Sequence, residues 1–362
     1  MLRGAIAIFK RDFKKFLSNP FVLFLTLAMP IMYLLIFGNA IGGTITGIPI
    51  GVVQDTPYIT DTPLYTQTVI NLDQIHEPGK ADTFRVIRYN DPQTAKNALE
   101  KGRLYGVVVF PPGISANDPV QLYLDSSEYT IPQLVKSGVI AAVAATGAAA
   151  PVNPINIYGT IEYLQFFGIG VIVLAIFSTT MFGGGIAMIR DREMGIIEGY
   201  LVTPVKRSSI ILGTIGSGTV KAFFAGFIIF LVDIFVAGVI VRSAEDFFLV
   251  MLVIFITSIG VTSLVVSLAS RFSNQQEYAS TIAFMNLLLF MTSGVFYPII
   301  GMPEWLRWIT AINPEAYAIH ALRSITLRNQ GLDVIWLDLV AIGIFSIAMI
   351  ILGILTYRRT LE

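Results

Sequence analysis

The chain has 362 residues, of which 54% are hydrophobic and 13% charged, and its 24 basic and 24 acidic residues balance to a formal net charge of zero. This composition lies outside the range of soluble globular domains and predicts a protein that crosses a membrane several times. The charge balance gives no indication of nucleic-acid binding. The chain has no cysteine and only two histidines, His76 and His320, which excludes a disulfide framework and a thiolate or histidine-rich metal site.

Residues 1–19 predict a basic amphipathic helix on the cytoplasmic membrane surface, because apolar side chains recur every three or four positions among basic ones. The basic residues are equally explained as topology signals alone, and both interpretations place the N-terminus inside. No small-residue cleavage site follows them, so we expect no cleaved signal peptide. Residues 20–42 then predict a first span, with a kink at Pro30.

Residues 43–160 are polar and predict an α+β domain outside the membrane. Asp91-Pro92 predicts the start of a short helix that stops before Gly102. Residues 141–150 are too short to span and predict the end of a helix that leads back to the membrane. Because one span precedes the domain and the N-terminus is inside, we expect the domain on the outside. Four strands are predicted, at Ile48–Gln54, Phe84–Tyr89, Tyr105–Phe110 and Val120–Leu124.

Residues 161–362 predict five further transmembrane helices, so that six spans return the C-terminus to the cytoplasm. Arg271 and Arg358-Arg359 agree with this orientation, because basic residues favour cytoplasmic loops. The predicted spans are Leu164–Ile189, Thr219–Val241, Phe247–Ala269, Ala279–Tyr297 and Ile335–Tyr357.

A charged segment, residues 190–207, separates the second and third predicted spans. Its Arg190, Arg192, Lys206 and Arg207 place it on the cytoplasmic side, and Pro204 predicts the end of a helix. One interpretation is a surface helix that receives force from a soluble partner. The other is a charged loop that only obeys the positive-inside rule.

Residues 298–333, between the fifth and sixth predicted spans, combine prolines with Trp305, Trp308 and Tyr317. Aromatic side chains with one polar end favour the membrane interface, so the residues alone predict an interfacial loop on the outer side.

The order and spacing of several short motifs around six spans resemble the type-two ABC exporter permeases, in the branch with a large ectodomain that exports drugs and lipids. In the charged segment, Ile196 and Gly199-Tyr200 depart from the residues usual in that family. The motifs are Asn19-Pro20, Met29-Pro30 and Phe37-Gly38; Arg192 to Gly195, Glu198, Leu201 to Pro204 and Leu212-Gly213; and Ser293 to Pro298, Met302 to Leu306, Asn313-Pro314, Tyr317-Ala318 and Ala321 to Arg323.

The resemblance implies two functional segments. Residues 190–207 would form a coupling helix that docks on an ATPase subunit, and residues 298–333 would dip back into the membrane near the pathway exit. The implied coupling residues are Arg190, Arg192, Glu193, Gly195, Glu198, Thr203 and Pro204, and those of the external re-entrant segment are Gly294, Pro298, Pro303, Trp305, Asn313, Pro314, Tyr317 and Arg323.

The sequence carries no phosphate loop, since Thr219 stands where the glycine-rich run from Gly213 would need its lysine. We expect a packing role for these glycines. Nucleophile-elbow and metalloprotease motifs are also missing, so the chain is predicted not to be an enzyme. ATP and magnesium are expected on a separate ATPase subunit, and this chain is expected to bind no cofactor.

Asp233 and Asn286 are the polar residues singled out within predicted spans. Asp233 is expected eight residues before the outer end of the third span, or about 12 Å deep. A carboxylate at such depth either pairs with a cation, Arg242 or Arg323 being the candidates, or lines the translocation pathway.

The sequence thus predicts the permease subunit of an ATP-driven exporter for a drug-like or lipid-like compound. We expect it in a prokaryotic cell membrane, with both termini cytoplasmic, in contact with lipids and paired with a second copy or a paralogous permease. The alternative is a membrane-anchored receptor or scaffold whose external domain binds a ligand without transport. A secondary transporter is a third possibility, but paired repeats and several buried charges are not apparent.

Overall fold

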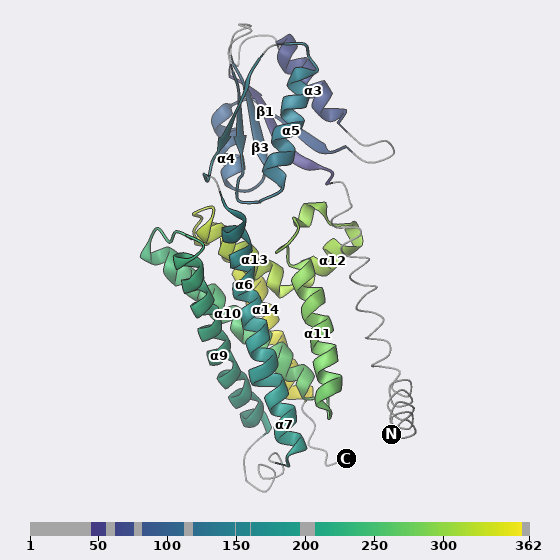
Figure 1. Ribbon diagram of the computed structural model, residues 1–362, viewed down its shortest axis with the longest axis vertical. Helices are drawn as coiled ribbons and strands as arrows, with labels where there is room; N and C mark the ends of the chain where they lie inside the picture. The colour runs from purple at the N-terminus through teal and green to yellow at the C-terminus, as the bar shows by residue number, and fades with distance from the viewer. Residues whose placement is uncertain are drawn as a thin grey trace, which may run out of the picture.

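The computed structural model describes residues 45–55, 62–75, 82–111, 119–148, 150–159, 161–195 and 207–356. They form an α/β domain stacked on one end of a helical bundle (Figure 1). The predicted surface helix 1–19 and first span 20–42 lie outside these residues.

The α/β domain contains one five-stranded sheet in the order β2-β1-β3-β4-β5. β1 pairs in parallel with β2 and β3, β3 pairs antiparallel with β4, and β4 pairs in parallel with β5. The elements are β1 (Ile48–Gln54), α3 (Pro63–Asp73), β2 (Phe84–Tyr89), α4 (Pro92–Glu100), β3 (Gly106–Phe110), β4 (Val120–Leu124), α5 (Ile131–Ala144) and β5 (Val152–Asn156).

The four predicted strands and the helix after Asp91 are confirmed, but the α+β class is wrong. α3, most of α5 and β5 were not predicted from the sequence, and with them the helical crossovers that parallel strands require. β5 is short, polar and half exposed, and it carries Pro154, which is tolerated only at a sheet edge such as this one. The domain is therefore α/β, with one antiparallel pair.

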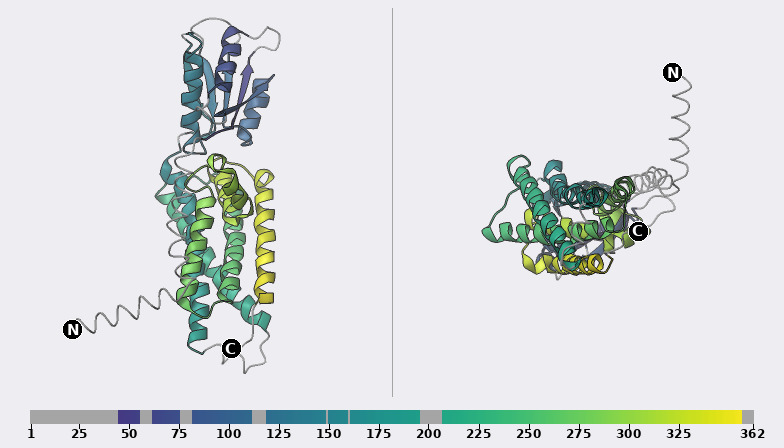
Figure 2. Two further views of the ribbon diagram at one scale, coloured as in Figure 1. Left: turned by 90° about the vertical axis from the view of Figure 1, so that its right-hand side faces the viewer. Right: turned by 90° about the horizontal axis from the view of Figure 1, so that it is seen from below.

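Helices cover both faces of the sheet, so its central strands are buried on both sides (Figure 2). Ile50 and Val52 of β1 belong to the apolar core shared with α3 and α5, whereas Val53 belongs to the core under α4. This explains the continuous apolar runs of β1 and β3, since a parallel strand has no solvent-facing side.

Among the described residues, the bundle contains four helices that are long and apolar enough to cross a membrane, at Tyr163–Glu193, Ile211–Phe235, Ala244–Ala269 and Leu332–Leu355. The first of these is continuous through α6, a π-helical segment η1 and α7. The elements are α6 (Tyr163–Thr180), η1 (Met181–Ile186), α7 (Ala187–Glu193), α9 (Arg207–Phe235), α10 (Ala244–Ala269), α11 (Gln275–Thr292), the 3-10 turn η2 (Ile299–Gly301), α12 (Glu304–Ile312), α13 (Pro314–Thr326) and α14 (Leu332–Thr356).

Two predicted spans differ from the helices observed. The third span, predicted at Thr219–Val241, is α9, which starts at Arg207 and ends at Phe235 because the chain turns through Gly238 with a positive φ of 69°. The fifth, predicted at Ala279–Tyr297, corresponds to α11, which starts with polar residues and stops before Gly294, where φ is 84°. α11 runs along the bundle, although it is not among the four long apolar helices (Figure 1).

α10 is the central helix of the bundle and packs against α6, α9, α13 and α14. Small residues allow this close packing: a Cβ on Gly218 of α9 would lie 2.5 Å from Thr262 Cγ2, and one on Gly260 would lie 2.7 Å from Ser346 Oγ. The packing role predicted for the glycines near Gly213 thus applies to Gly218. Close approach of backbones is the usual way in which helices associate within a membrane.

We predict that Gly138→Ala destabilises the α/β domain, because the added Cβ would lie 2.4 Å from two ring carbons of Phe84. Overpacking of this kind costs about 1–3 kcal/mol. Thermal unfolding of the full chain in detergent measures the loss, and adding Phe84→Leu should recover part of it. Gly213→Ala is the control, because nothing lies within 4 Å of its Cβ position. Equal melting temperatures for the two single variants would contradict the prediction.

Candidate functional site

The far end of the bundle, away from the α/β domain, carries the described part of the charged segment (Figure 1). Arg192 Nη1 donates to the carbonyl oxygen of Phe272 at 2.8 Å, and Nη2 donates to that of Ser270 at 3.4 Å. Glu193 accepts from the backbone N–H of Gln275 at 3.1 Å and from its side-chain amide at 2.7 Å. We call these five residues the α7 clamp.

The α7 clamp satisfies helix ends on both sides of the α10–α11 loop. The guanidinium of Arg192 donates hydrogen bonds to carbonyl oxygens just after the end of α10. The carboxylate of Glu193 lies at the start of α11, where the helix dipole favours a negative charge. Arg192 and Glu193 are therefore engaged within the chain, which the sequence analysis did not foresee. Their contact with an ATPase stays a prediction.

The other predicted coupling residues are placed differently. Arg190 is exposed, and Gly195 follows α7 with a positive φ of 70° that favours glycine. Glu198, Thr203 and Pro204 lie outside the described residues. Within residues 190–195 of the charged segment, Arg190 is thus exposed, whereas Arg192 is held by the α7 clamp.

At the opposite end, an ion pair joins the α/β domain to the bundle. Arg328, just after α13, lies 3.2 Å from the Asp125 carboxylate at the end of β4, and the two side chains are 9% and 0% exposed. This contact is not aligned as a hydrogen bond, but Arg328 Nε donates to Ser127 Oγ at 2.7 Å, and the Ser127 N–H donates to Asp125 at 3.0 Å. Burial alone would lower the pKa of Arg328, but the carboxylates of Asp125 and Glu128 raise it above its usual value.

Arg323 of α13 connects its helix to two further segments, α6 and the chain just after α11. Its guanidinium donates to the carbonyl oxygens of Gly294, Val295 and Phe166 at 2.9, 3.2 and 3.3 Å, and it lies 3.6 Å from the centre of the Phe166 ring. The structure therefore brings together Gly294 and Arg323, two of the residues predicted in the external segment. It adds Phe166 of α6, which the sequence analysis missed.

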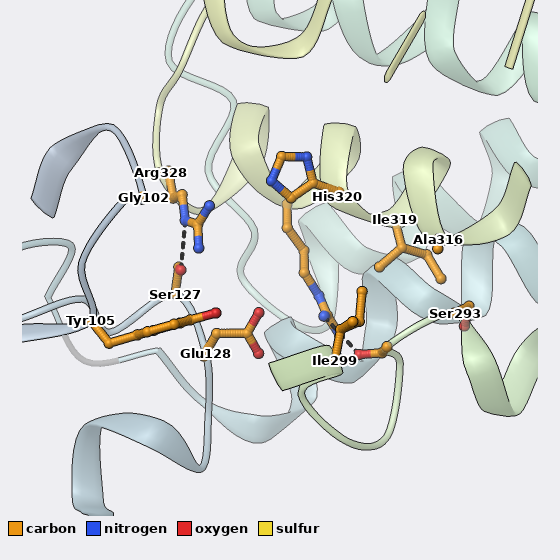
Figure 3. Close-up of a pocket in the computed structure, with 12 residues that line it drawn as sticks. Gly102, Tyr105, Ser127, Glu128, Ser293, Ile299, Ala316, Ile319, His320 and Arg328 are labelled. Carbon is orange, nitrogen blue, oxygen red and sulfur yellow. Dashed lines mark hydrogen bonds between the residues drawn. The ribbon is translucent and has the colours of Figure 1, made fainter. Parts of the chain in front are cut away.

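A cavity of about 130 Å³ at the junction of the domain and the bundle is lined by Arg323 and Arg328. Figure 3 shows the residues around it, with Arg328 among those labelled. Glu128 lines it from the domain side, and one of its carboxylate oxygens is buried without a hydrogen-bond partner. Burial raises the pKa of Glu128, and the two arginines oppose that shift. The lining is completed by Gly102, Tyr105, Ser127, Ser293, Gly294, Ile299, Ala316, Ile319 and His320.

The rest of the external segment is organised around the start of α13. Asn313 accepts from the Glu315 N–H at 2.9 Å as the N-cap, donates to Thr292 Oγ1 at 2.9 Å, and is followed by Pro314 at the first helical position. Pro298 and Pro303 directly precede η2 and α12. Tyr317 donates to the Ala311 carbonyl at 2.6 Å, and Trp305 and Trp308 of α12 are exposed, as the interfacial interpretation expects.

Asp233 is not deep in its helix, because α9 ends two residues later at Phe235. Its backbone carbonyl accepts from the Ala237 and Val239 N–H groups at 3.1 Å. Among the described residues, neither Arg242 nor Arg323 forms a salt bridge with it, so the ion-pair hypothesis receives no support. The carboxylate instead packs against α6, where a Cβ on Gly168 would lie 2.4 Å from Asp233 Oδ1. The side-chain oxygen of Asn286 on α11 is buried without a partner, and a pathway role for either residue stays a prediction.

Asp125, Glu128 and Arg328 were not predicted as site residues from the sequence. No local pattern marks them, because Asp125 and Arg328 come from positions about 200 residues apart and meet only in the folded chain. A run of charged residues or a local hydrophobic pattern around these positions could have marked them as site residues, and the sequence has neither there. Among the described residues, no group of three or more His, Asp or Glu side chains could hold a metal ion.

The apolar helices and the α/β domain define a helical membrane protein with one large polar domain. A family model described as ABC-2 family transporter protein matches residues 20–355. The chain therefore belongs to the ABC-2 transporter family, as the motifs predicted.

Curated relatives agree with this membership. ABC transporter G family member 20 of Dictyostelium discoideum is 23% identical over 99% of this chain and 51% of its own length. Two Escherichia coli (strain K12) proteins match less of the chain. The probable multidrug ABC transporter permease YbhR is 27% identical over 42% of this chain and 40% of its own length, and the inner membrane transport permease YhhJ is 28% identical over 49% and 47%. The chain thus spans about half the length of the relatives it matches.

We predict that Arg328→Gln lowers the stability of the full chain by about 3–5 kcal/mol, because it leaves the buried Asp125 carboxylate without its cation. The double variant with Asp125→Asn removes both charges and should recover most of the loss. Thermal unfolding of the wild type, the two single variants and the double variant gives the interaction free energy between Asp125 and Arg328. Arg88→Gln, an exposed position in β2, is the control. Simple additivity of the two single effects would show that the ion pair does not matter.

We also predict that Arg192→Ala destabilises the bundle, whereas Arg190→Ala does not. Hydrogen bonds from a charged donor contribute about 1.5–3 kcal/mol, and Arg192 makes two across the α10–α11 loop. An exposed substitution without such contacts changes stability by about 0.5 kcal/mol or less. Unfolding of both variants in detergent measures the difference, and an equal effect would refute the clamp.

Proposed function

We propose that the chain is the permease subunit of an ATP-driven exporter that moves a hydrophobic or amphipathic compound out of the cytoplasm or the inner leaflet. The observation that carries this proposal is the match of the ABC-2 family along nearly the whole chain. The names of the relatives support transport, since they include transport permeases and a multidrug permease.

In this proposal the chain has six spans, of which the first is residues 20–42 and the fifth is α11. Arg190 and Arg192 belong to α7, which lies at the end of the bundle away from the α/β domain, and short basic loops favour the cytoplasmic side. The domain then lies outside, and both termini are cytoplasmic. The expected setting is a prokaryotic cell membrane.

The energy source is a separate ATPase subunit that holds ATP and magnesium, and two copies of this chain, or one copy and a paralogue, form the pathway. The α7 clamp supports a route for force. A push on the charged segment reaches α11 directly, since Arg192 and Glu193 join the end of α7 to the α10–α11 loop. ATP-driven closure of the ATPase would thereby shift the spans from inward-open to outward-open.

The test is ATP hydrolysis and transport with the ATPase encoded beside this chain. We expect no phosphate release from the purified chain alone, and we expect ATP-dependent export of a fluorescent amphiphile by proteoliposomes that hold both subunits. A partner that lacks its phosphate-loop lysine is the control. Phosphate release by the contaminant-free chain would contradict the proposal, and a partner that binds without any transport would favour a receptor or scaffold.

A further inference from the structure

Lys221 is an exposed cation near the middle of a helix that is apolar enough to cross a membrane. It lies fourteen residues after Arg207 and fourteen before Phe235, the ends of α9, or about 21 Å from each end along the axis at about 1.5 Å per residue. A lysine side chain cannot reach the membrane surface from the bilayer centre without cost, so a charge there marks a functional surface or a hydrated path.

The side chain of Lys221 lies against η1, the π-helical segment that continues α6. Its Cδ is 3.6 Å from the position that a Cβ on Gly183 would occupy, and its Nζ donates to the Gly183 carbonyl at 3.3 Å. Gly183 belongs to η1, the π-helical segment, and π-helical turns often occur at functional sites. An ammonium group has three N–H donors, and no carboxylate of the described residues pairs with this one, so donors remain for a ligand.

Ser217 provides a second polar group on the same face, one turn before Lys221. It is exposed, and its hydroxyl makes no hydrogen bond among the described residues. This is unlike the serines of α10: Ser258, Ser263 and Ser267 each donate to the carbonyl four residues earlier, which is how a hydroxyl is usually satisfied in a membrane helix. The hydroxyl of Ser217 is therefore free to bind a ligand together with Lys221.

Large apolar side chains flank this pair. Phe182 precedes Gly183 on η1, and Val220 and Phe224 lie beside Lys221 on α9; all three are more than half exposed. A cation and a hydroxyl surrounded by exposed apolar groups match a molecule with one anionic end and a hydrophobic body. We propose that Lys221 and Ser217 bind the carboxylate or phosphate of an anionic amphiphile, whose apolar part lies against Phe182 and Phe224.

A second copy of this chain is a poorer occupant of the same face. Around a two-fold axis the two Lys221 ammonium groups would face each other, and like charges at this depth repel. No exposed carboxylate of the described residues lies at the same depth to pair with them: Asp233 is buried near the end of α9, and Glu277 lies at the start of α11. An anion neutralises the lysine, whereas a second copy does not.

The inference rests on the proposed transport function, because it names the class of cargo, but its test needs neither ATP nor the ATPase. The full chain is placed in nanodiscs of phosphatidylcholine, and binding of 11-(dansylamino)undecanoic acid is followed by its fluorescence. The methyl ester of the same probe has no anionic group. We expect Lys221→Gln to weaken binding of the acid about tenfold, as loss of one charge-assisted hydrogen bond predicts, and to leave binding of the ester unchanged.

The controls separate charge at this site from charge elsewhere. Lys221→Arg keeps the cation and should retain binding, Ser217→Ala should weaken it about threefold, and Arg242→Gln, which removes an exposed cation beyond the end of α9, should have no effect. Melting temperatures identify any variant that fails to fold. If Lys221→Gln is such a variant, binding of the acid and of the ester is compared between the wild-type chain and Lys221→Arg. Competition by phosphatidylglycerol in the nanodisc would identify a bilayer lipid as the source of the anion, and its absence would identify a free amphiphile.

Two results would overturn the proposal. One is equal binding of the acid by the wild-type chain and Lys221→Gln. The other is formation of a disulfide-linked dimer by Lys221→Cys, which would place this face between two copies, since the chain has no native cysteine. If the acid binds as expected but no ATP-driven transport is found, the site stands and the proposed function fails.

Discussion

The guanidinium of Arg323 connects elements that are far apart in the sequence. It satisfies carbonyl groups of Phe166 on α6 and of Gly294 and Val295 after α11, while its own backbone belongs to α13. A buried cation must find such partners, because an unpaired charge in a dry interior costs several kcal/mol. The ends of α6, α11 and α13 are therefore held in one arrangement. Arg323 also lines the same cavity as Arg328, whose ion pair with Asp125 joins the α/β domain to the bundle.

At the other end of the bundle, charged side chains also join several helices by satisfying their backbone groups, but with different residues and a different geometry. There Arg192 and Glu193 reach from the end of α7 to the ends of α10 and α11. Helix termini carry unsatisfied N–H and C=O groups, and charged side chains of matching sign satisfy them. α6–α7 and α11 are thus fastened to each other at both ends, by Arg323 at one and by the α7 clamp at the other. A force applied to one of these helices cannot leave the other in place without breaking these hydrogen bonds.

Between the two ends, small residues decide how closely the helices approach. Gly218 and Gly260 let α9 and α14 contact α10, and Gly185 of η1 receives the buried ring of Tyr278, whose hydroxyl would lie 1.7 Å from an added Cβ. The same is true of Lys221, since the absence of a side chain at Gly183 leaves room for its aliphatic part. In the proposed transport cycle this places an anion-binding group beside the π-helical segment of α6, and this helix also carries the α7 clamp.

Much of the fold follows from local patterns in the sequence. Alternating and continuous apolar runs located four of the five strands, Asp91-Pro92 located α4, and apolar length located the helices that became α6–α7, α9, α10 and α14. The motif order around these helices also sufficed to identify the family. These features depend on residues that are close in the chain, so that burial and backbone propensity decide them without knowledge of distant partners.

Tertiary structure alone decided the parallel pairing in the sheet, the end of α9 and the partners of the charged residues. β5 is too short and polar to be recognised until it pairs with β4, and Asp233 moved from mid-span to a helix end because a turn at Gly238 stops α9. Asp125 and Arg328 are unremarkable positions in the sequence. They matter because they form a buried ion pair, in which the loss of either partner leaves an uncompensated charge. Composition and periodicity therefore determined which segments form helices long and apolar enough to cross a membrane, whereas the contacts of buried charges depend on distances between remote segments, which only the folded chain fixes.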